Sequence, residues 1–199
     1  MNRLPALLAV PCLALLLAGP AAGQSMHSLE LLRGEEVGIN PRYLLQDPNG
    51  RAVTQEEFRG RFQLIAFGYT YCPDFCPTTL AKLRQIRSEL GDDAGRMQVI
   101  MISVDPERDT PDLLARYTAA FDASFVGLTG APDEIDAVGD TYGLFYQKHE
   151  GSAATGYLVD HSTRTYLIGP DGRALVAYPH DATADAILAD LRWLLDQES

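Results

Sequence analysis

Two near-continuous apolar runs, separated by an amphipathic segment, constrain most strongly what this chain can fold into. The runs are residues 62–68 (FQLIAFG) and 97–104 (MQVIMISV), and such runs are typical of strands buried on both faces of a sheet. Between them, apolar residues recur at helical spacing, with charged residues on the opposite side: Leu80, Leu83, Ile86 and Leu90. The pattern predicts two parallel strands joined by a crossover helix, which is a βαβ unit.

The flanking segments extend this unit into one α/β domain over residues 40–199. Residues 43–46 and 52–54 flank the turn Pro48-Asn49-Gly50, and an Asn-Gly turn predicts a β-hairpin. After the βαβ unit we expect helices over 111–121, 132–142 and 183–195, a strand over 125–128, and a second hairpin built from 157–159, 165–168 and 174–178. This order predicts a thioredoxin-like fold with an added N-terminal β-hairpin.

The first 23 residues differ in composition from the rest of the chain. Arg3 precedes the uncharged apolar run 4–18 and the small residues 21–23, which is the pattern of a secretory signal peptide. An N-terminal membrane anchor is the alternative, because residues 4–23 are uncharged and about 20 residues suffice to span a bilayer. Either alternative predicts a periplasmic protein, anchored to the inner membrane if the segment is retained. Residues 24–39 carry no clear period and predict a flexible leader.

The charge of the chain excludes one class of partner. Its 27 acidic and 16 basic residues give a formal net charge of -11. A surface of this charge repels polyanions, so we expect no nucleic-acid partner.

Cys72 and Cys76 are the cysteines that remain once the N-terminal segment is set aside. Two cysteines four positions apart close too small a loop to stabilise a whole domain as a disulfide, so we expect a chemical role. They follow the first parallel strand, at the sheet edge where α/β proteins build their sites. A helical turn would place both sulfurs on one face, and the helix N-terminus would favour thiolates. The pair can form a disulfide or bind one metal ion, and the spacing leaves both open.

A histidine at the same edge favours the metal. We expect the hairpin strand that starts near residue 162 to pair beside the cysteine-bearing strand. This pairing brings His161 to the same sheet edge as Cys72, whereas His180 lies one strand further out, about 4.8 Å more distant. Thioredoxin-like oxidoreductases carry a cis-proline in the corresponding loop; here that loop, residues 158–162, reads LVDHS and has no proline. Two thiolates and one imidazole suit copper. The alternative is that His161 merely caps the strand or bonds to its neighbours.

Three motifs in this order resemble the Sco/SenC family of copper proteins. They are residues 67–77 (FGYTYCPDFCP), 103–110 (SVDPERDT) and 160–162 (DHS) followed by 166–172 (YLIGPDG). The resemblance covers residues 40–196 and implies a thioredoxin-like domain that binds one copper ion per chain, Cu(I) or Cu(II), through three residues: Cys72, Cys76 and His161. Family members serve the assembly of the CuA centre of cytochrome c oxidase, as copper donors, as reductants of the target cysteines, or both.

The resemblance implies two candidate functions. The first is a metallochaperone that receives copper from an upstream donor and delivers it to, or prepares, the CuA-bearing oxidase subunit. The second is a thiol-disulfide reductase whose Cys72–Cys76 pair cycles with a thiol reductant and keeps the CuA-site cysteines reduced. Turn and cap chemistry explains most of Asp105 to Thr110. Asp160 either orients His161 or is solvated at the rim.

Overall fold

The computed structural model of the chain describes residues 39–151 and 156–198. The signal peptide or membrane anchor predicted for residues 1–23, and all but the last residue of the leader predicted for 24–39, lie outside this range. Within the described residues, none of the helices combines the length and the apolar character needed to cross a bilayer.

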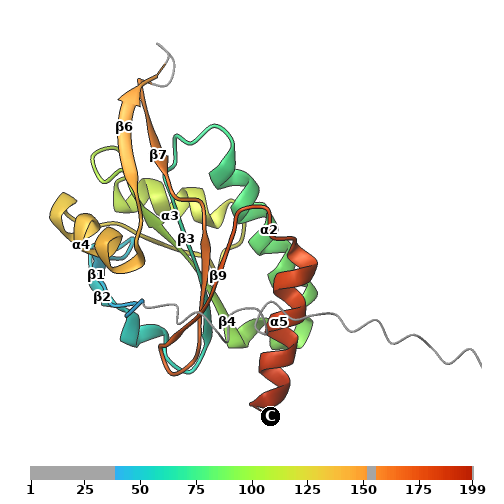
Figure 1. Cartoon of the computed structure of the whole chain (residues 1–199). Coiled ribbons are helices and arrows are strands. Elements are labelled where there is room, and N and C mark those ends of the chain that lie inside the picture. The colour runs from blue at the N-terminus through green and yellow to red at the C-terminus, as the bar shows by residue number, and fades with distance from the viewer. Residues whose placement is uncertain (1–38, 152–155, 199) are drawn as a thin grey trace, which may run out of the picture.

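A five-stranded sheet in the order β5-β4-β3-β8-β9 forms the centre of the molecule (Figure 1). β3 (Phe62–Gly68), β4 (Met97–Ser103) and β5 (Val126–Leu128) are parallel, whereas β8 (Thr165–Ile168) and β9 (Ala174–Tyr178) are antiparallel to their neighbours. All residues of β3 and β4 are buried, because helices or a hairpin cover both faces of the sheet. The two apolar runs are therefore the central parallel strands, as predicted.

Alternate residues of β3 divide the core into two layers. Leu64 and Ala66 pack with three helices on one face: α2 (Phe75–Glu89), α3 (Pro111–Ala119) and α5 (Ala184–Gln197). Ile65 and Phe67 pack with α4 (Pro132–Tyr142) and the N-terminal hairpin on the other face. Figure 1 shows α2 and α5 side by side on the right and α4 with the hairpin on the left. Successive side chains of β3 thus point to opposite faces of the sheet and contribute to both layers of the core.

The N-terminal hairpin consists of β1 (Leu44–Gln46) and β2 (Ala52–Thr54), which pair antiparallel. Gly50 in its turn has φ +71°, a conformation that glycine adopts without steric cost. Two 3-10 helices lie in the connections between these elements: η1 (Gln55–Phe58) between β2 and β3, and η2 (Gly91–Arg96) between α2 and β4. The predicted thioredoxin-like α/β fold with an added N-terminal hairpin is confirmed.

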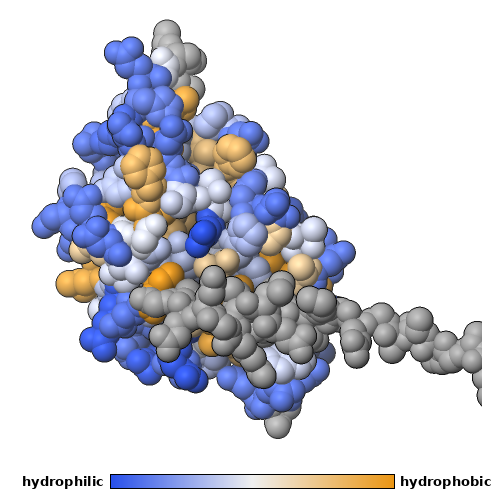
Figure 2. Space-filling model, viewed as in Figure 1, coloured by the Kyte–Doolittle hydropathy of each residue, from blue (hydrophilic) through white to orange (hydrophobic). Residues whose placement is uncertain are grey.

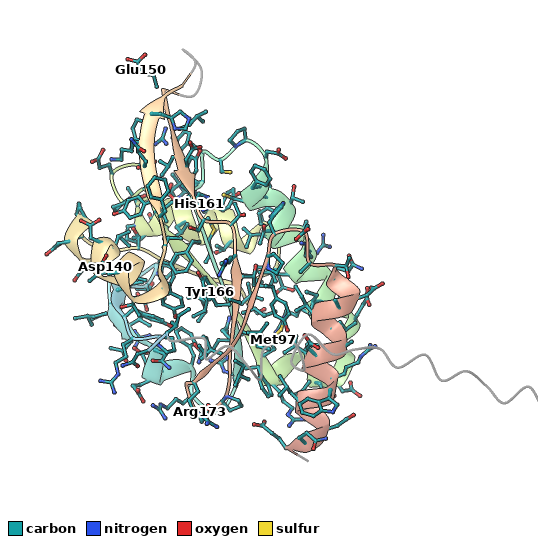
Figure 3. The ribbon with its side chains drawn as sticks, viewed as in Figure 1. Met97, Asp140, Glu150, His161, Tyr166 and Arg173 are labelled. Atoms are coloured by element: carbon teal, nitrogen blue, oxygen red, sulfur yellow. The ribbon has the colours of Figure 1, made fainter. Side chains whose placement is uncertain are left out.

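The prediction of the second hairpin was partly wrong. β8 and β9 pair as expected, but β7 (Tyr157–His161) pairs with β6 (Tyr146–Glu150), a strand that the sequence did not predict. The sequence of β6 is polar and its residues are largely exposed, so it lacks an apolar pattern. This separate hairpin projects from the top of the molecule, with Glu150 near its tip and His161 at its base (Figure 3).

Candidate metal centre

The loop between β3 and α2 carries both cysteines. Cys72 lies two residues before Asp74, the N-cap of α2, and Cys76 lies in the first turn of that helix. The backbone N–H of Cys76 donates to the Cys72 sulfur at 3.4 Å, and the N–H of Cys72 donates to the Tyr69 carbonyl at 3.2 Å. Cys72 is therefore not part of a continuous helical turn. Its sulfur instead accepts from an N-terminal N–H of α2, which still brings the two cysteines together.

Gly68, the last residue of β3, makes room for the second cysteine. A Cβ atom at this position would lie 2.8 Å from the Cys76 sulfur and 3.2 Å from Cε of Met101. The Cys76 side chain is buried against the strand backbone, whereas Cys72 is half-buried at the pocket. One sulfur of the pair is thus fixed in the core and the other faces the opening.

The two thiols differ in their readiness to ionise. A hydrogen bond from Cys76, assisted by His161 and by backbone N–H groups, lowers the pKa of Cys72 to about 4. The same hydrogen bond, together with burial and the charge of Cys72, raises the pKa of Cys76 far above its ordinary value. In the reduced protein at neutral pH, Cys72 is consequently a thiolate and Cys76 is the thiol that donates to it.

His161 ends β7 and faces the cysteines. Its Nε2 atom lies 3.7 Å from the Cys76 sulfur, and its Nδ1 atom lies 2.9 Å from the Ser162 carbonyl oxygen. A carbonyl only accepts, so Nδ1 donates to Ser162 and Nε2 is the ring nitrogen that faces the sulfurs. The backbone thereby fixes the orientation of the ring, with Nε2 toward the cysteines.

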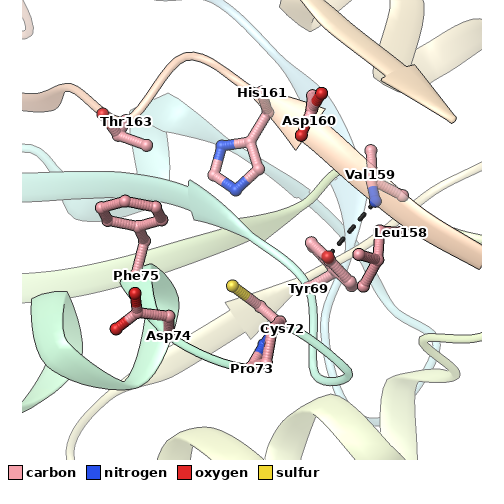
Figure 4. Close-up of a pocket in the computed structure, with 10 residues that line it drawn as sticks. All are labelled: Tyr69, Cys72, Pro73, Asp74, Phe75, Leu158, Val159, Asp160, His161 and Thr163. Carbon is pink, nitrogen blue, oxygen red and sulfur yellow. Dashed lines mark hydrogen bonds between the residues drawn. The ribbon is translucent and has the colours of Figure 1, made fainter. Parts of the chain in front are cut away.

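A cavity of about 390 Å³ opens beside these groups (Figure 4). In the close-up, the His161 ring and the Cys72 sulfur face each other across it. The N–H of Val159 donates to the Tyr69 hydroxyl at 3.2 Å, which ties β7 to the cysteine loop. The lining residues are Tyr69, Cys72, Pro73, Asp74, Phe75, Leu158, Val159, Asp160, His161 and Thr163.

The structure brings the three predicted ligands together in an open arrangement. Within residues 39–151 and 156–198, no three His, Cys, Asp or Glu side chains are close enough to enclose a metal ion as they stand. Cys72, Cys76 and His161 are linked by the contacts described above, and their side chains must turn inward to share one ion. The donor set fits copper because two sulfurs and one imidazole nitrogen are ligands that copper accepts.

Comparisons with known proteins identify the family of the chain. The SCO1/SenC family profile matches residues 33–196. The chain belongs to the SCO1/SenC family. It is 37% identical over 172 residues to the mitochondrial SCO2 homolog of Bos taurus, covering 85% of this chain and 64% of that relative. The chain thus spans less than two thirds of the length of this relative.

Two solved structures of Sco proteins with copper bound have the same fold. The ScoI protein of Arabidopsis thaliana superposes with a TM-score of 0.75 at 32% identity, covering 80% of this chain and 99% of that one. The ScoI protein of Bradyrhizobium japonicum superposes with a TM-score of 0.70 at 39% identity, covering 78% and 98%.

Two acidic residues of the Sco motif at residues 103–110 support the site, although turn and cap chemistry had seemed enough to explain them. Asp109 is fully buried and accepts from the Thr70 hydroxyl at 2.6 Å, the Thr70 N–H at 3.1 Å and the Ser103 hydroxyl at 2.7 Å. It thereby anchors the loop two residues before Cys72. Thr110 is the cap that the sequence predicted, since its hydroxyl accepts from the Leu113 N–H at 3.3 Å.

Asp105 anchors the β6–β7 hairpin through Tyr157, the first residue of β7. It is fully buried, pairs with Arg108 and accepts from the Tyr157 hydroxyl at 2.5 Å. The Arg108 guanidinium stacks on the Tyr157 ring, with its carbon 3.6 Å from the ring centroid, and lies 4.8 Å from that of Tyr71. The sequence feature that indicates this network is the presence of charged residues directly after the buried strand β4.

Asp160 does not orient His161. Its exposed carboxylate lies 3.4 Å from Nδ1 of His149, and the Ser162 carbonyl holds the His161 ring instead. His180, the weaker ligand candidate, packs its ring edge-on against Phe75 at 4.7 Å between centroids. Asp160 is thus a rim residue, and His180 a neighbour of the pocket wall.

Proposed function

We propose that the protein is a copper metallochaperone that binds one copper ion, Cu(I) or Cu(II), with Cys72, Cys76 and His161. It delivers this ion to, or prepares, the CuA centre of cytochrome c oxidase. The observation that carries the proposal is the His161 Nε2 atom, which lies 3.7 Å from the Cys76 sulfur and beside Cys72, whose pKa is lowered to about 4. Two relatives have been solved with copper bound, which supports copper as the ion that this chain binds.

The protonation states of the ligands suit capture of a soft cation. The lowered pKa of Cys72 favours its thiolate, and the Ser162 carbonyl holds the His161 ring with Nε2 toward the sulfurs, so both donors face the site before copper arrives. Cys76 keeps its proton through the hydrogen bond to Cys72, and it releases that proton when copper takes both sulfurs. Three donors complete a site for Cu(I), whereas a structural zinc site requires four.

The open arrangement suits release as well as capture. Cys72 and His161 line a cavity of about 390 Å³, whereas the buried Cys76 is not among its lining residues. An acceptor ligand can approach copper through this cavity while the protein ligands still hold it. Copper then moves by ligand exchange and is never free in solution.

The transfer itself tests the proposal. The reduced full chain is loaded with Cu(I) and mixed with the reduced, copper-free CuA domain of the oxidase subunit, and copper in each protein is measured after separation. We expect stoichiometric transfer from the wild type. His161→Ala should fail to retain copper, whereas the matched variant His180→Ala should behave as wild type. No transfer to the CuA domain would contradict the proposal.

The unequal thiols support a second candidate, a thiol-disulfide reductase. A thiolate at Cys72 next to a buried thiol at Cys76 is the arrangement in which one cysteine attacks a disulfide and the other resolves it. The pair cannot bind copper as a disulfide, so the two functions alternate. Reduction of an oxidised CuA domain by the full chain, with Cys76→Ser trapped as a mixed disulfide, is the result expected for this candidate.

We also propose how residues 40–199, the copper-binding domain, are exported, supplied with copper and kept reduced. The proposals are export to the periplasm by the signal peptide or anchor at residues 1–23, supply of copper by an upstream donor, and reduction of the cysteine pair by a thiol reductant. N-terminal sequencing of the exported protein separates the signal peptide from the anchor, because cleavage gives a chain that starts at Gln24.

A further inference from the structure

Exposed aromatic side chains gather around the opening of the metal centre. Of the large hydrophobic residues in the described part of the chain, four are exposed: Leu44, Tyr71, Phe75 and Phe145. Three of them adjoin the site. Tyr71 precedes Cys72 and Phe75 lines the cavity. Phe145 is joined to Ser162, next to His161, by hydrogen bonds of 2.9 and 3.2 Å. Such clustering of exposed apolar side chains marks an interaction surface.

Two of the three rings, those of Phe75 and Tyr71, contact side chains of the protein. Phe75 packs against the His180 ring at 4.7 Å, and the Tyr71 ring centroid lies 4.8 Å from the Arg108 guanidinium carbon. Figure 2 shows separate hydrophobic patches among hydrophilic side chains on the upper half of this face. Because fixed rings lose little conformational entropy on binding, they are suited to serve as contact points for another protein.

The charge of the opening specifies the partner. Asp74 and Asp160 are exposed, and among the described residues that line the cavity they are the charged ones of either sign. The whole chain carries a net charge of -11. A complementary surface therefore has lysines or arginines around an apolar centre, because opposite charges steer two proteins into contact.

We propose that Tyr71, Phe75 and Phe145, bordered by Asp74 and Asp160, form the docking surface for the copper-accepting protein. The acceptor meets this surface with an apolar patch surrounded by basic side chains, and its own copper ligands then lie at the cavity mouth. The inference rests on the proposed function for the identity of the acceptor, the CuA domain, and goes beyond it in assigning the surface and its chemistry.

Binding and transfer, measured separately, test this surface. The full chain, loaded with Cu(I), is titrated into fluorescently labelled CuA domain to obtain Kd, and copper transfer is followed by stopped flow. The double variant Tyr71→Ser/Phe145→Ser removes two rings without touching a metal ligand. Leu44→Ser is the matched control, because Leu44 is equally exposed but lies on β1, away from the cavity.

We expect the double variant to raise Kd and slow transfer by about tenfold or more, as loss of aromatic contact residues does, with copper affinity unchanged. Leu44→Ser should leave both quantities unchanged. Added salt should weaken binding of the wild type, and it should weaken binding of Asp74→Asn/Asp160→Asn less.

The outcomes separate the two proposals. A wild type that does not bind the CuA domain, or a double variant that binds as tightly as Leu44→Ser, overturns the docking surface. A wild type that binds through these rings without transferring copper supports the docking surface and overturns the chaperone function.

Discussion

Gly68→Ala is the substitution that tests most sharply how the fold positions the second sulfur. The added Cβ would lie 2.8 Å from the Cys76 sulfur and 3.3 Å from Cβ of the same residue. Non-bonded heavy atoms settle about 3.5–4.0 Å apart, so the sulfur must retreat by roughly 0.7–1.2 Å. Inserting a methyl group into a packed site costs about 1–3 kcal/mol.

The sulfur that the methyl group displaces belongs to one of the three proposed copper ligands. Copper binding must therefore work against the same contact to hold this sulfur beside Cys72 and His161. A penalty of about 1.4–2.8 kcal/mol corresponds to a 10- to 100-fold weaker affinity. We therefore expect Gly68→Ala to weaken Cu(I) binding by that factor.

The assay is competition between the reduced full chain and a Cu(I) chelator of known affinity, with urea unfolding measured in parallel. Gly95→Ala is the matched control, because a Cβ at Gly95 meets nothing within 4 Å. It should bind copper as the wild type does. Gly68→Ala with wild-type copper affinity would refute the argument that the approach of the Cys76 sulfur to β3 sets the geometry of the site.

Three further predictions concern the supporting network and the reactive thiol. Asp109→Ala leaves the donors of half-buried Thr70 and buried Ser103 without this acceptor, so the free energy of unfolding in urea should fall by about 2–4 kcal/mol. Asp109→Asn keeps an acceptor oxygen and should lose less; equal losses would contradict the role of that oxygen. Tyr157→Phe removes a hydrogen bond to a buried carboxylate and should cost about 1.5–3 kcal/mol in the same measurement, and an unchanged stability would show that the contact with Asp105 contributes nothing. The rate of alkylation of Cys72 by iodoacetamide should be nearly independent of pH above about 5 and should fall as the pH passes down through about 4, because the lowered pKa of Cys72 keeps the thiol ionised. A rate that keeps rising up to about pH 8.5 is the profile of an ordinary thiol and would refute the lowered pKa.

The parts of the fold that could be predicted are those in which burial leaves a pattern in the sequence. Residues 62–68 and 97–103 lie in the middle of the sheet, so both faces of each strand are apolar and the run is continuous. The same topology brings the cysteine loop and His161 to one edge, because β8 pairs antiparallel beside β3. Position in the sheet was thus enough to choose His161 over His180.

The rest depends on contacts that a sequence does not display. β6 is polar on both faces and gains its strand structure from pairing with β7 alone. Asp109 looks like a turn residue, and its burial becomes evident once Thr70, 39 positions earlier, is placed against it. The partner of His161 is the backbone carbonyl of Ser162. Every residue carries such a carbonyl, so the sequence left open whether Asp160 orients His161 or lies solvated at the rim.

Copper stoichiometry tests the central claim most directly. The reduced full chain is titrated with copper, and bound metal and the absorption spectrum are recorded for the wild type, His161→Ala and His180→Ala. We predict one copper per chain for the wild type and His180→Ala, with strong thiolate-to-Cu(II) charge-transfer bands, and loss of tight binding and of these bands in His161→Ala. Wild-type affinity and spectrum in His161→Ala, or no stable copper in any of the three proteins, would contradict this prediction.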